Sequence, residues 1–204
     1  MRLRYKNMAN KVQFGLSNVY YAILTEADNT APAYGTPKKL AGAVSLELSQ
    51  EGAETNFYAD NIEYFRVSQY NGYSGSLEMA KITDEALKDI WGFGYDTTNK
   101  IVFESADAEA KPFALLFQIE GDANEDLYVL YKCYASRPNV GSTTINENGK
   151  EPQTQTVDLT CVPLVDPTGG VMDKKTYAKT DDTTGTTVKN GWFSSVFTGF
   201  TASV

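Results

Sequence analysis

The sequence contains no histidine and only two cysteines, Cys133 and Cys161, among its 204 residues. The absence of histidine excludes Ser-His-Asp and Cys-His catalysis, histidine-ligated zinc and a histidine pH switch. Two cysteines are too few for a disulfide framework or a four-cysteine zinc site. Among common enzyme chemistries, only paired carboxylates, lysine or a Ser-Lys pair remain open.

Long apolar runs are also missing. No stretch approaches the ~20 apolar residues of a membrane helix. The basic residues Arg2, Arg4 and Lys6 are not followed by the apolar segment of a signal peptide. We therefore expect a chain that is made and kept in the cytosol with reduced thiols. Met8 offers an alternative start, so residues 1–11 are expected to be a leader or arm.

Basic residues are in the minority. The chain has 18 Lys and Arg against 26 Asp and Glu, which gives a net charge of −8 and an isoelectric point near 4.6. A field of this sign should not hold nucleic acid. Hydrophobic residues make up 42% of the chain, enough for a core, and its 13 Tyr and 10 Phe favour β-structure.

Alternation of apolar and polar residues predicts strands along most of the chain. The expected strands are 12–26, 40–49, 73–80, 101–105, 113–120, 126–136 and 154–164. Turns are expected at Asp60-Asn61 and Asn71-Gly72. The one expected helix, 83–91, has Thr83 as its N-cap and Gly92 as its stop. We predict a mainly β (α+β) fold with a short helix at its side.

Length and composition fit one domain with arms. After the leader we predict a β domain at 12–165 and a C-terminal extension or arm at 166–204. The extension is Thr-, Asp- and Gly-rich and irregular over 166–189, and its last stretch, 191–204, is apolar. Apolar terminal segments stay disordered unless they dock, so this one should dock on the fold or on a neighbour.

Residues 50–71 are long, turn-rich and aromatic, a composition typical of interface anchors. They form either an extended loop toward other subunits or a β-hairpin in the monomer's own sheet. The candidates for contacts between subunits, here and in the C-terminal stretch, are Phe57, Tyr58, Tyr64, Phe65, Tyr70, Trp192, Phe193 and Phe197.

Three of the predicted strands carry small or acidic side chains on their polar faces, with no Lys or Arg. These residues are Ser45, Glu47, Ser49, Ser74, Ser76, Glu78, Thr154, Thr156 and Asp158. On the strand at 40–49 the opposite face is apolar, with Val44, Leu46 and Leu48. The pattern fits either the solvated surface of a sandwich or a polar wall that lines a cavity or channel.

Catalytic and ligand-binding motifs are not found. Asp122, Asn124 and Asp126 have the spacing of a calcium loop, but Leu127 and Cys133 stand where Gly and Glu are needed. A polar hairpin turn explains these acids better. Phosphate-binding glycine loops are absent, and acidic neighbours in caps do not face each other across a cleft. We expect no enzyme, catalytic residue, metal or cofactor.

Three ordered blocks stand out along the chain. They are MANKVQFGLSNVYYAILTE near the start, YADN and YNGYSGSLEMAKITDEALKDIWGF in the centre, and a hairpin that ends in CYASRP. These blocks resemble the major tail proteins of siphophages, the subunits of the tail tube. The resemblance covers residues 8–165, includes no catalytic signature and does not extend past Pro167.

The resemblance implies a phage tail-tube fold, in which a two-sheet β-sandwich-like core carries a flanking α-helix, an extended loop and terminal arms. Six subunits would form a ring, and four strands of each would join an inner β-barrel. Stacked rings would surround a tape-measure protein, meet terminator and initiator proteins, and later conduct double-stranded DNA without binding it specifically. The protein would then be a virion component, assembled in the host cytoplasm.

A tube of this kind makes the polar residues candidates for its lumen, because a channel for DNA must not bind phosphate. Alternation groups residues on a face but does not say which face turns inward. Two other functions remain open. One is a monomeric, adhesin-like β-sandwich that binds carbohydrate through its tyrosines, and the other is a hydrolase with two carboxylates.

Overall fold

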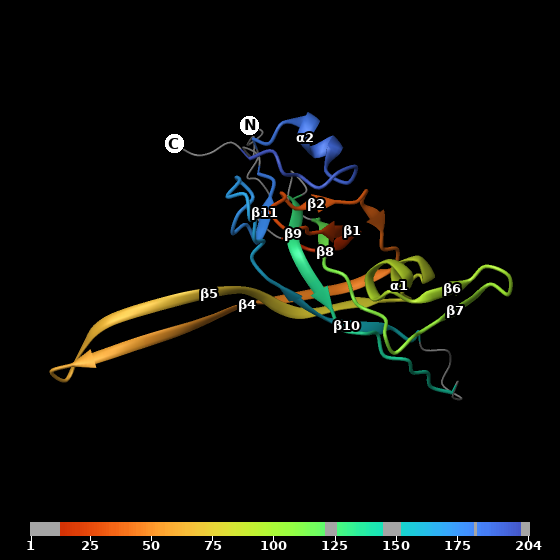
Figure 1. Cartoon of the computed structure of the whole chain (residues 1–204), viewed down its shortest axis with the longest axis horizontal. Coiled ribbons are helices and arrows are strands. Elements are labelled where there is room, and N and C mark those ends of the chain that lie inside the picture. The colour runs from red at the N-terminus through yellow and green to blue at the C-terminus, as the bar shows by residue number, and fades with distance from the viewer. Residues whose placement is uncertain (1–12, 121–125, 145–151, 182, 201–204) are drawn as a thin grey trace, which may run out of the picture.

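The computed structural model describes residues 13–120, 126–144, 152–181 and 183–200. Figure 1 shows a folded body from which one long hairpin projects, with helix α1 (Asp84–Trp91) and a second, shorter hairpin toward the opposite end. The shorter hairpin pairs β6 (Gly94–Asp96) with β7 (Ile101–Phe103).

Most strands of the described residues belong to one antiparallel sheet, which confirms the mainly β class. The path through the sheet is β2-β1-β8-β9-β10-β5-β4, with β3 beside β1 and β11 beside β9. The bounds are β1 (Leu16–Thr25), β2 (Ala33–Tyr34), β3 (Lys38–Lys39), β4 (Ala43–Ala59), β5 (Ile62–Met79), β8 (Phe113–Ile119), β9 (Asp126–Ala135), β10 (Gln155–Cys161) and β11 (Tyr177–Lys179).

The sheet folds over so that its two halves share one core. Tyr21 and Phe113, from β1 and β8, lie in the same buried cluster as Leu77 and Leu159, from β5 and β10. Strand β9 belongs to both halves because it pairs with β8 on one side and with β10 on the other. The expected sandwich-like core is therefore made by one continuous sheet rather than by two separate sheets.

Helix α1 closes one end of this core, as its sequence predicts. The Thr83 hydroxyl accepts a hydrogen bond from the Ala86 N–H at 3.3 Å, and Gly92 ends the helix with a φ of 69°. Ile90 and Trp91 are buried, and the Trp91 indole N–H donates to the Ser136 carbonyl at 2.8 Å. The short helix is thus held by packing on the sheet.

Residues beyond β10 cover the outer face of β1, β8 and β9. Trp192 and Val196 are buried against Leu116 and Val129 in a second cluster. This is why β8 is buried on both faces. The prediction of irregular structure at 166–189 is wrong in part, because the segment contains β11 and most of α2 (Thr186–Gly191).

Two local predictions are wrong. Asn71-Gly72 is not a turn, because β5 runs through it. Gly72 has a φ of 110°, and a side chain there would collide with the Cys161 carbonyl, so glycine serves a bend within the strand. Val44 does not face the core, because a register shift between Ala43 and Ser45 leaves it 51% exposed.

Candidate functional site

The predicted polar residues meet on one face of three neighbouring strands, β4, β5 and β10. The register aligns them in rows: Ser45, Glu78 and Thr156, then Glu47, Ser76 and Asp158, then Ser49, Ser74 and Thr160. Thr154 immediately precedes β10 and also contacts Glu78. We call the nine predicted residues together with Thr160 the polar wall. The other face of the same strands is buried in the core.

Glu78 is the hub of the polar wall. One carboxylate oxygen, Oε2, accepts a hydrogen bond from the Ser45 hydroxyl at 3.0 Å, and Oε1 accepts one from the Thr154 hydroxyl at 2.6 Å. These two donors, with Thr154 the stronger, hold the pKa of Glu78 below its ordinary value. The carboxylate therefore stays ionised, and it ties β4, β5 and β10 together across their polar face.

The wall is negative and has no cation of its own. Strands β4 and β10 contain no basic residue, and Arg66, the basic residue of β5, lies far along the projecting hairpin. The neighbouring strand β9 contains Lys132, whose ammonium lies 2.7 Å from a carboxylate oxygen of Glu26. Among the described residues no ion pair is formed by Glu47, Glu78 or Asp158, so an anion that meets the wall encounters hydroxyl groups and unpaired carboxylates.

The wall ends at an open edge. Strand β4 is last in the sheet order, and within the described residues it pairs only with β5. An edge of this kind presents backbone N–H and C=O groups that can bind another strand. The polar wall can therefore continue into a neighbouring chain.

The β4–β5 hairpin extends well beyond the body (Figure 1). We call residues 51–71 the arm. At its tip, Asp60 and Asn61 have φ values of 52° and 64°, so the predicted two-residue turn is confirmed. Residues 50–71 thus form a β-hairpin continuous with the monomer's own sheet, and because its outer part projects from the body, contacts with other subunits remain a prediction.

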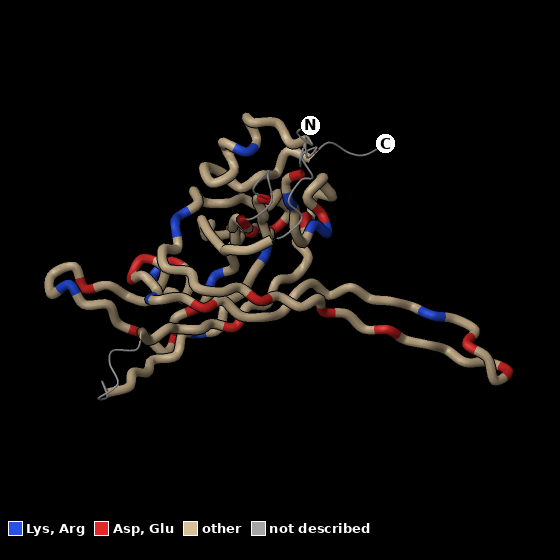
Figure 2. The backbone as a smooth tube through the Cα atoms, turned by 180° about the vertical axis from the view of Figure 1, so that it is seen from behind, with Lys and Arg blue, Asp and Glu red and all other residues tan. Residues whose placement is uncertain are grey.

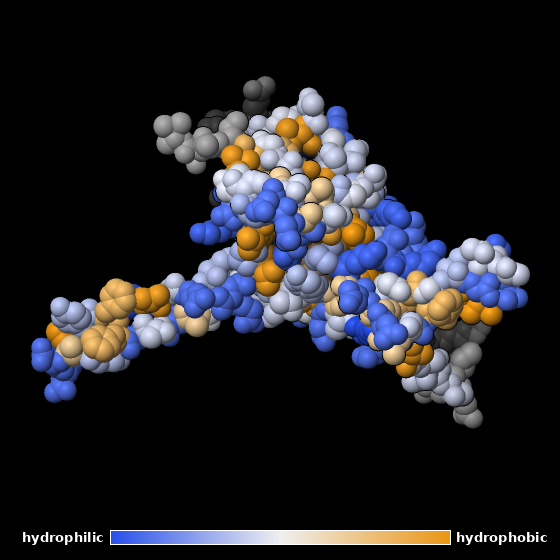
Figure 3. All heavy atoms as spheres, in the orientation of Figure 1, coloured by the Kyte–Doolittle hydropathy of each residue, from blue (hydrophilic) through white to orange (hydrophobic). Residues whose placement is uncertain are grey.

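Large apolar side chains of the arm stand in solvent, and Figure 3 shows them gathered near its tip. The exposed fractions of these side chains lie between 40 and 72%, and the residues are Phe57, Tyr58, Ile62, Tyr64, Phe65, Val67 and Tyr70. A two-stranded hairpin is marginally stable alone in water. An arm with this composition is therefore suited to a surface that covers it.

The two faces of the arm differ. Phe57 lies directly opposite Phe65, and Thr55 opposite Val67, so these pairs share one face. The alternate pairs lie on the other face, where the Arg66 guanidinium is 2.6 Å from Glu54. Figure 2 shows acidic and basic residues spread along the arm. The face with Phe57 and Phe65 is apolar, whereas the other face combines Glu54 and Arg66 with Tyr58 and Tyr70, which alternate onto it.

The C-terminal aromatic residues that were predicted to contact other subunits do not lie on the arm but pack on the body of the protein. Trp192 is 3% exposed, and its indole N–H donates to the Tyr128 carbonyl at 3.2 Å. Phe193 stacks on Tyr20 with ring centroids 4.8 Å apart, and Phe197 stacks on Trp192. Of the two alternatives for this stretch, its described part docks on its own fold.

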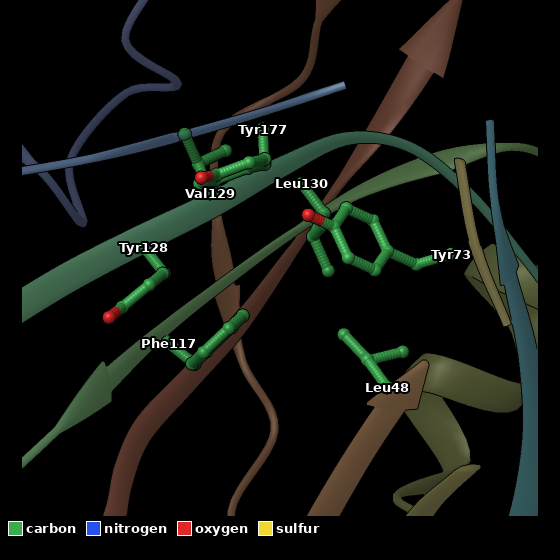
Figure 4. Close-up of a pocket in the computed structure, with 7 residues that line it drawn as sticks. All are labelled: Leu48, Tyr73, Phe117, Tyr128, Val129, Leu130 and Tyr177. Atoms are coloured by element: carbon green, nitrogen blue, oxygen red, sulfur yellow. The ribbon is translucent and has the colours of Figure 1, made fainter. Parts of the chain in front are cut away.

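An apolar pocket of about 210 Å³, which the sequence did not indicate, lies at the base of the arm (Figure 4). It is lined by Leu48, Tyr73, Phe117, Tyr128, Val129, Leu130 and Tyr177. The Tyr73 and Tyr177 rings meet edge to face at 5.9 Å. Burial raises the pKa of Tyr73 to about 12, so its phenol stays neutral. The pocket offers apolar surface and phenol groups, without an acid–base pair.

Acidic residues elsewhere do not form an ion site in the described part of the chain. No three His, Cys, Asp or Glu side chains there lie together as metal ligands. In the calcium-like spacing, Asp122 and Asn124 lie outside the described residues, and Asp126 pairs with Lys179 at 3.2 Å. The described helices also include none with the length and apolar character to cross a membrane.

Comparison with known proteins gives a distant structural likeness. No protein-family model matches the sequence, and no curated protein matches it. A similar solved structure is the cap of the anti-feeding prophage, described as a tube-terminating cap. It aligns with a TM-score of 0.35 and 11% identity over 88% of this chain and 99% of that chain. A likeness at this level defines neither the fold nor the function.

Proposed function

We propose that the chain is a non-enzymatic structural subunit of a phage tail tube, built from stacked hexameric rings that conduct double-stranded DNA. The resemblance of residues 8–165 to siphophage major tail proteins suggests this class. The observation that carries the proposal is the polar wall, whose hydroxyls and acids lie together on β4, β5 and β10.

The chemistry of the wall suits a conduit for DNA. Duplex DNA carries one negative charge per ~1.7 Å, so a few basic contacts per ring, repeated along a tube, would hold it tightly. The carboxylates Glu47, Glu78 and Asp158 repel phosphate over roughly a Debye length, about 8 Å at physiological salt. Hydroxyl groups between them keep the surface wetted. DNA should therefore slide past such a surface.

Ring formation uses the open edge. Strand β4 of one subunit pairs with an exposed strand of its neighbour, and six copies close the polar walls into one inner barrel. Closure satisfies the backbone groups of every edge at once and leaves no free end in the ring. The interface should reach the size of obligate assemblies, roughly 2,000–5,000 Å².

Stacking uses the arm. The arm reaches a subunit of the adjacent ring, and its apolar face, centred on Phe57 and Phe65, is buried there. Aromatic side chains contribute most to binding when they are fully buried in an interface. The tube encloses a tape-measure protein during assembly and meets terminator and initiator proteins at its ends. The subunit is thus assembled in the host cytoplasm and carried in the virion.

Size-exclusion chromatography combined with negative-stain imaging tests the proposal on the purified protein. Rings or tubes of uniform width are expected. A monomer at all concentrations would contradict self-assembly, and if it bound glycans, it would favour the carbohydrate-binding alternative. Turnover that is lost when one acid pair is mutated would instead indicate a hydrolase.

A further inference from the structure

The chain's two cysteines, 28 positions apart, lie side by side in the core. Cys133 of β9 is directly opposite Cys161 of β10, their sulfur atoms are 2.9 Å apart, and both residues are fully buried as free thiols. Directly opposed residues of antiparallel strands have Cα atoms about 4.5–5.5 Å apart. That separation lies within the 4.4–6.8 Å range of disulfides.

The pair sits at the shortest joint along the path β1-β8-β9-β10-β5-β4 of the sheet. β9 and β10 register through only three residue pairs, of which Cys133 with Cys161 is one. This joint connects the half built on β1, β8 and β9 to the half that carries the polar wall. A covalent bond here would fasten the two halves of the core to each other.

We propose that Cys133 and Cys161 form an intrachain disulfide when the folded protein meets a small oxidant such as hydrogen peroxide. One thiol is oxidised to a sulfenic acid with release of water. The second sulfur then attacks it, the S–O bond breaks, the S–S bond forms and a second water leaves. In sum, two thiols and one peroxide yield one disulfide and two waters. The inference stands independently of the tube proposal.

Burial controls when the bond can form. It raises the pKa of the Cys133 thiol, which keeps the reactive thiolate scarce while the core is closed. Reducing cytosol would keep both thiols free during synthesis, and an oxidising exterior would favour the bond. The cysteines thus act as small core residues while reduced and as a covalent cross-link between β9 and β10 after oxidation.

Intact mass spectrometry of the peroxide-treated, full-length protein tests this inference. After denaturation with an alkylating reagent, untreated protein should take up two alkyl groups and treated protein none. Because the chain has no other cysteine, protection in a monomer whose mass is lower by two hydrogens, with no added oxygen, identifies the Cys133–Cys161 bond. The melting temperature should rise by roughly 5–15 °C and return after reduction with dithiothreitol.

Cys161→Ala is the matched control, and after peroxide treatment it should show no reversible rise in melting temperature. The mass readout needs no variant, so it decides the question even if Cys161→Ala is unstable. Uptake of two alkyl groups by treated wild-type protein that remains folded would overturn the inference. So would a disulfide between two chains, or sulfinic acid at either cysteine in place of the bond.

Discussion

At the residue scale, the polar wall shows what strand periodicity can predict. Alternation placed Glu47, Glu78 and Asp158 on polar faces, and the register brings those faces together. Alternation failed at Val44, because a bulge shifts it, and the Asn71-Gly72 turn signal failed because a glycine with positive φ can bend a strand as well as turn it. Partners such as Ser45 for Glu78 depend on strand order, which no local pattern contains.

The hydrogen bonds to Glu78 predict a measurable titration. Ser45→Ala combined with Thr154→Ala should raise the pKa of Glu78 toward 4.5, its ordinary value, because both donors stabilise the carboxylate. NMR titration of the glutamate side chains measures this shift. Ser49→Ala, a wall hydroxyl in another row, is the control and should leave it unchanged.

The lowered pKa of Glu78 also determines how the stability of the fold changes with pH. Because the folded protein holds the pKa of Glu78 below 4.5, the contribution of Glu78 to stability is present above its unfolded pKa. It is lost as pH falls from there through the folded pKa. The Ser45→Ala, Thr154→Ala protein should therefore lose less stability than wild type on acidification through this range. Identical acid sensitivity in the two proteins would contradict the role of the hydroxyl donors.

At the element scale, the helix and most strands could be predicted from local signals, but the arm could not. Its aromatic residues and turn at Asp60-Asn61 were visible, yet two 17- and 18-residue strands exceed what short alternating runs indicate. Nor does composition reveal that the C-terminal aromatics meet their own sheet, because that contact joins Trp192 to Tyr128 across the chain. Both features are products of tertiary packing.

The two faces of the arm predict different assembly defects. Phe57→Ser with Phe65→Ser should raise the protein concentration needed for assembly by roughly 1,000-fold, since buried aromatic anchors are worth ~2 kcal/mol each and every ~1.4 kcal/mol is tenfold. Glu54→Ser with Arg66→Ser, on the opposite face, is the matched control and should change it little, because exposed ion pairs contribute little. Sedimentation of tubes across a concentration series measures both; equal effects would argue against an apolar stacking face.

Because the C-terminal segment is buried, its removal should lower the stability of the monomer. If 191–204 docked on a neighbour, its deletion would weaken polymerisation more than folding, but Trp192 and Val196 belong to a core cluster of the same chain. Trp192→Ala should lower the free energy of unfolding by about 3–5 kcal/mol. Denaturant titration of the monomer measures this, with exposed Val165→Ala expected within ~0.5 kcal/mol of wild type. A Trp192→Ala monomer of wild-type stability would show that this segment packs elsewhere.

At the scale of the whole molecule, the acidic polar wall and the projecting arm share two strands, β4 and β5. The wall lies on the body, the arm projects to one side, and the open edge of β4 joins them (Figure 1). The negative net charge was evident from composition, but its placement required the fold. Which face turns toward a lumen is a property of the assembly, beyond any single chain.

Charge reversal on the wall tests its role in DNA passage. Glu47→Lys, Glu78→Lys and Asp158→Lys together should leave tubes assembled but slow or arrest genome ejection, because each ring would then bind phosphate. High salt should restore part of the rate. Ejection from particles that carry the variant subunit, followed by DNA release, is the measurement.

A control of equal charge separates lumen effects from net charge. Asp28→Lys, Asp107→Lys and Glu109→Lys change the charge by the same amount at three exposed acids that do not belong to the wall. This variant should eject DNA at the wild-type rate. Wild-type ejection by the wall variant, or equal arrest in both, would count against the lumen assignment.

A side-chain-resolution cryo-EM reconstruction of the assembled protein tests the central proposal most directly. It should show six-subunit rings joined through strand β4, with Glu47, Glu78 and Asp158 pointing into a continuous bore. Rings in which this face turns outward, or a bore lined with lysine and arginine, would contradict it.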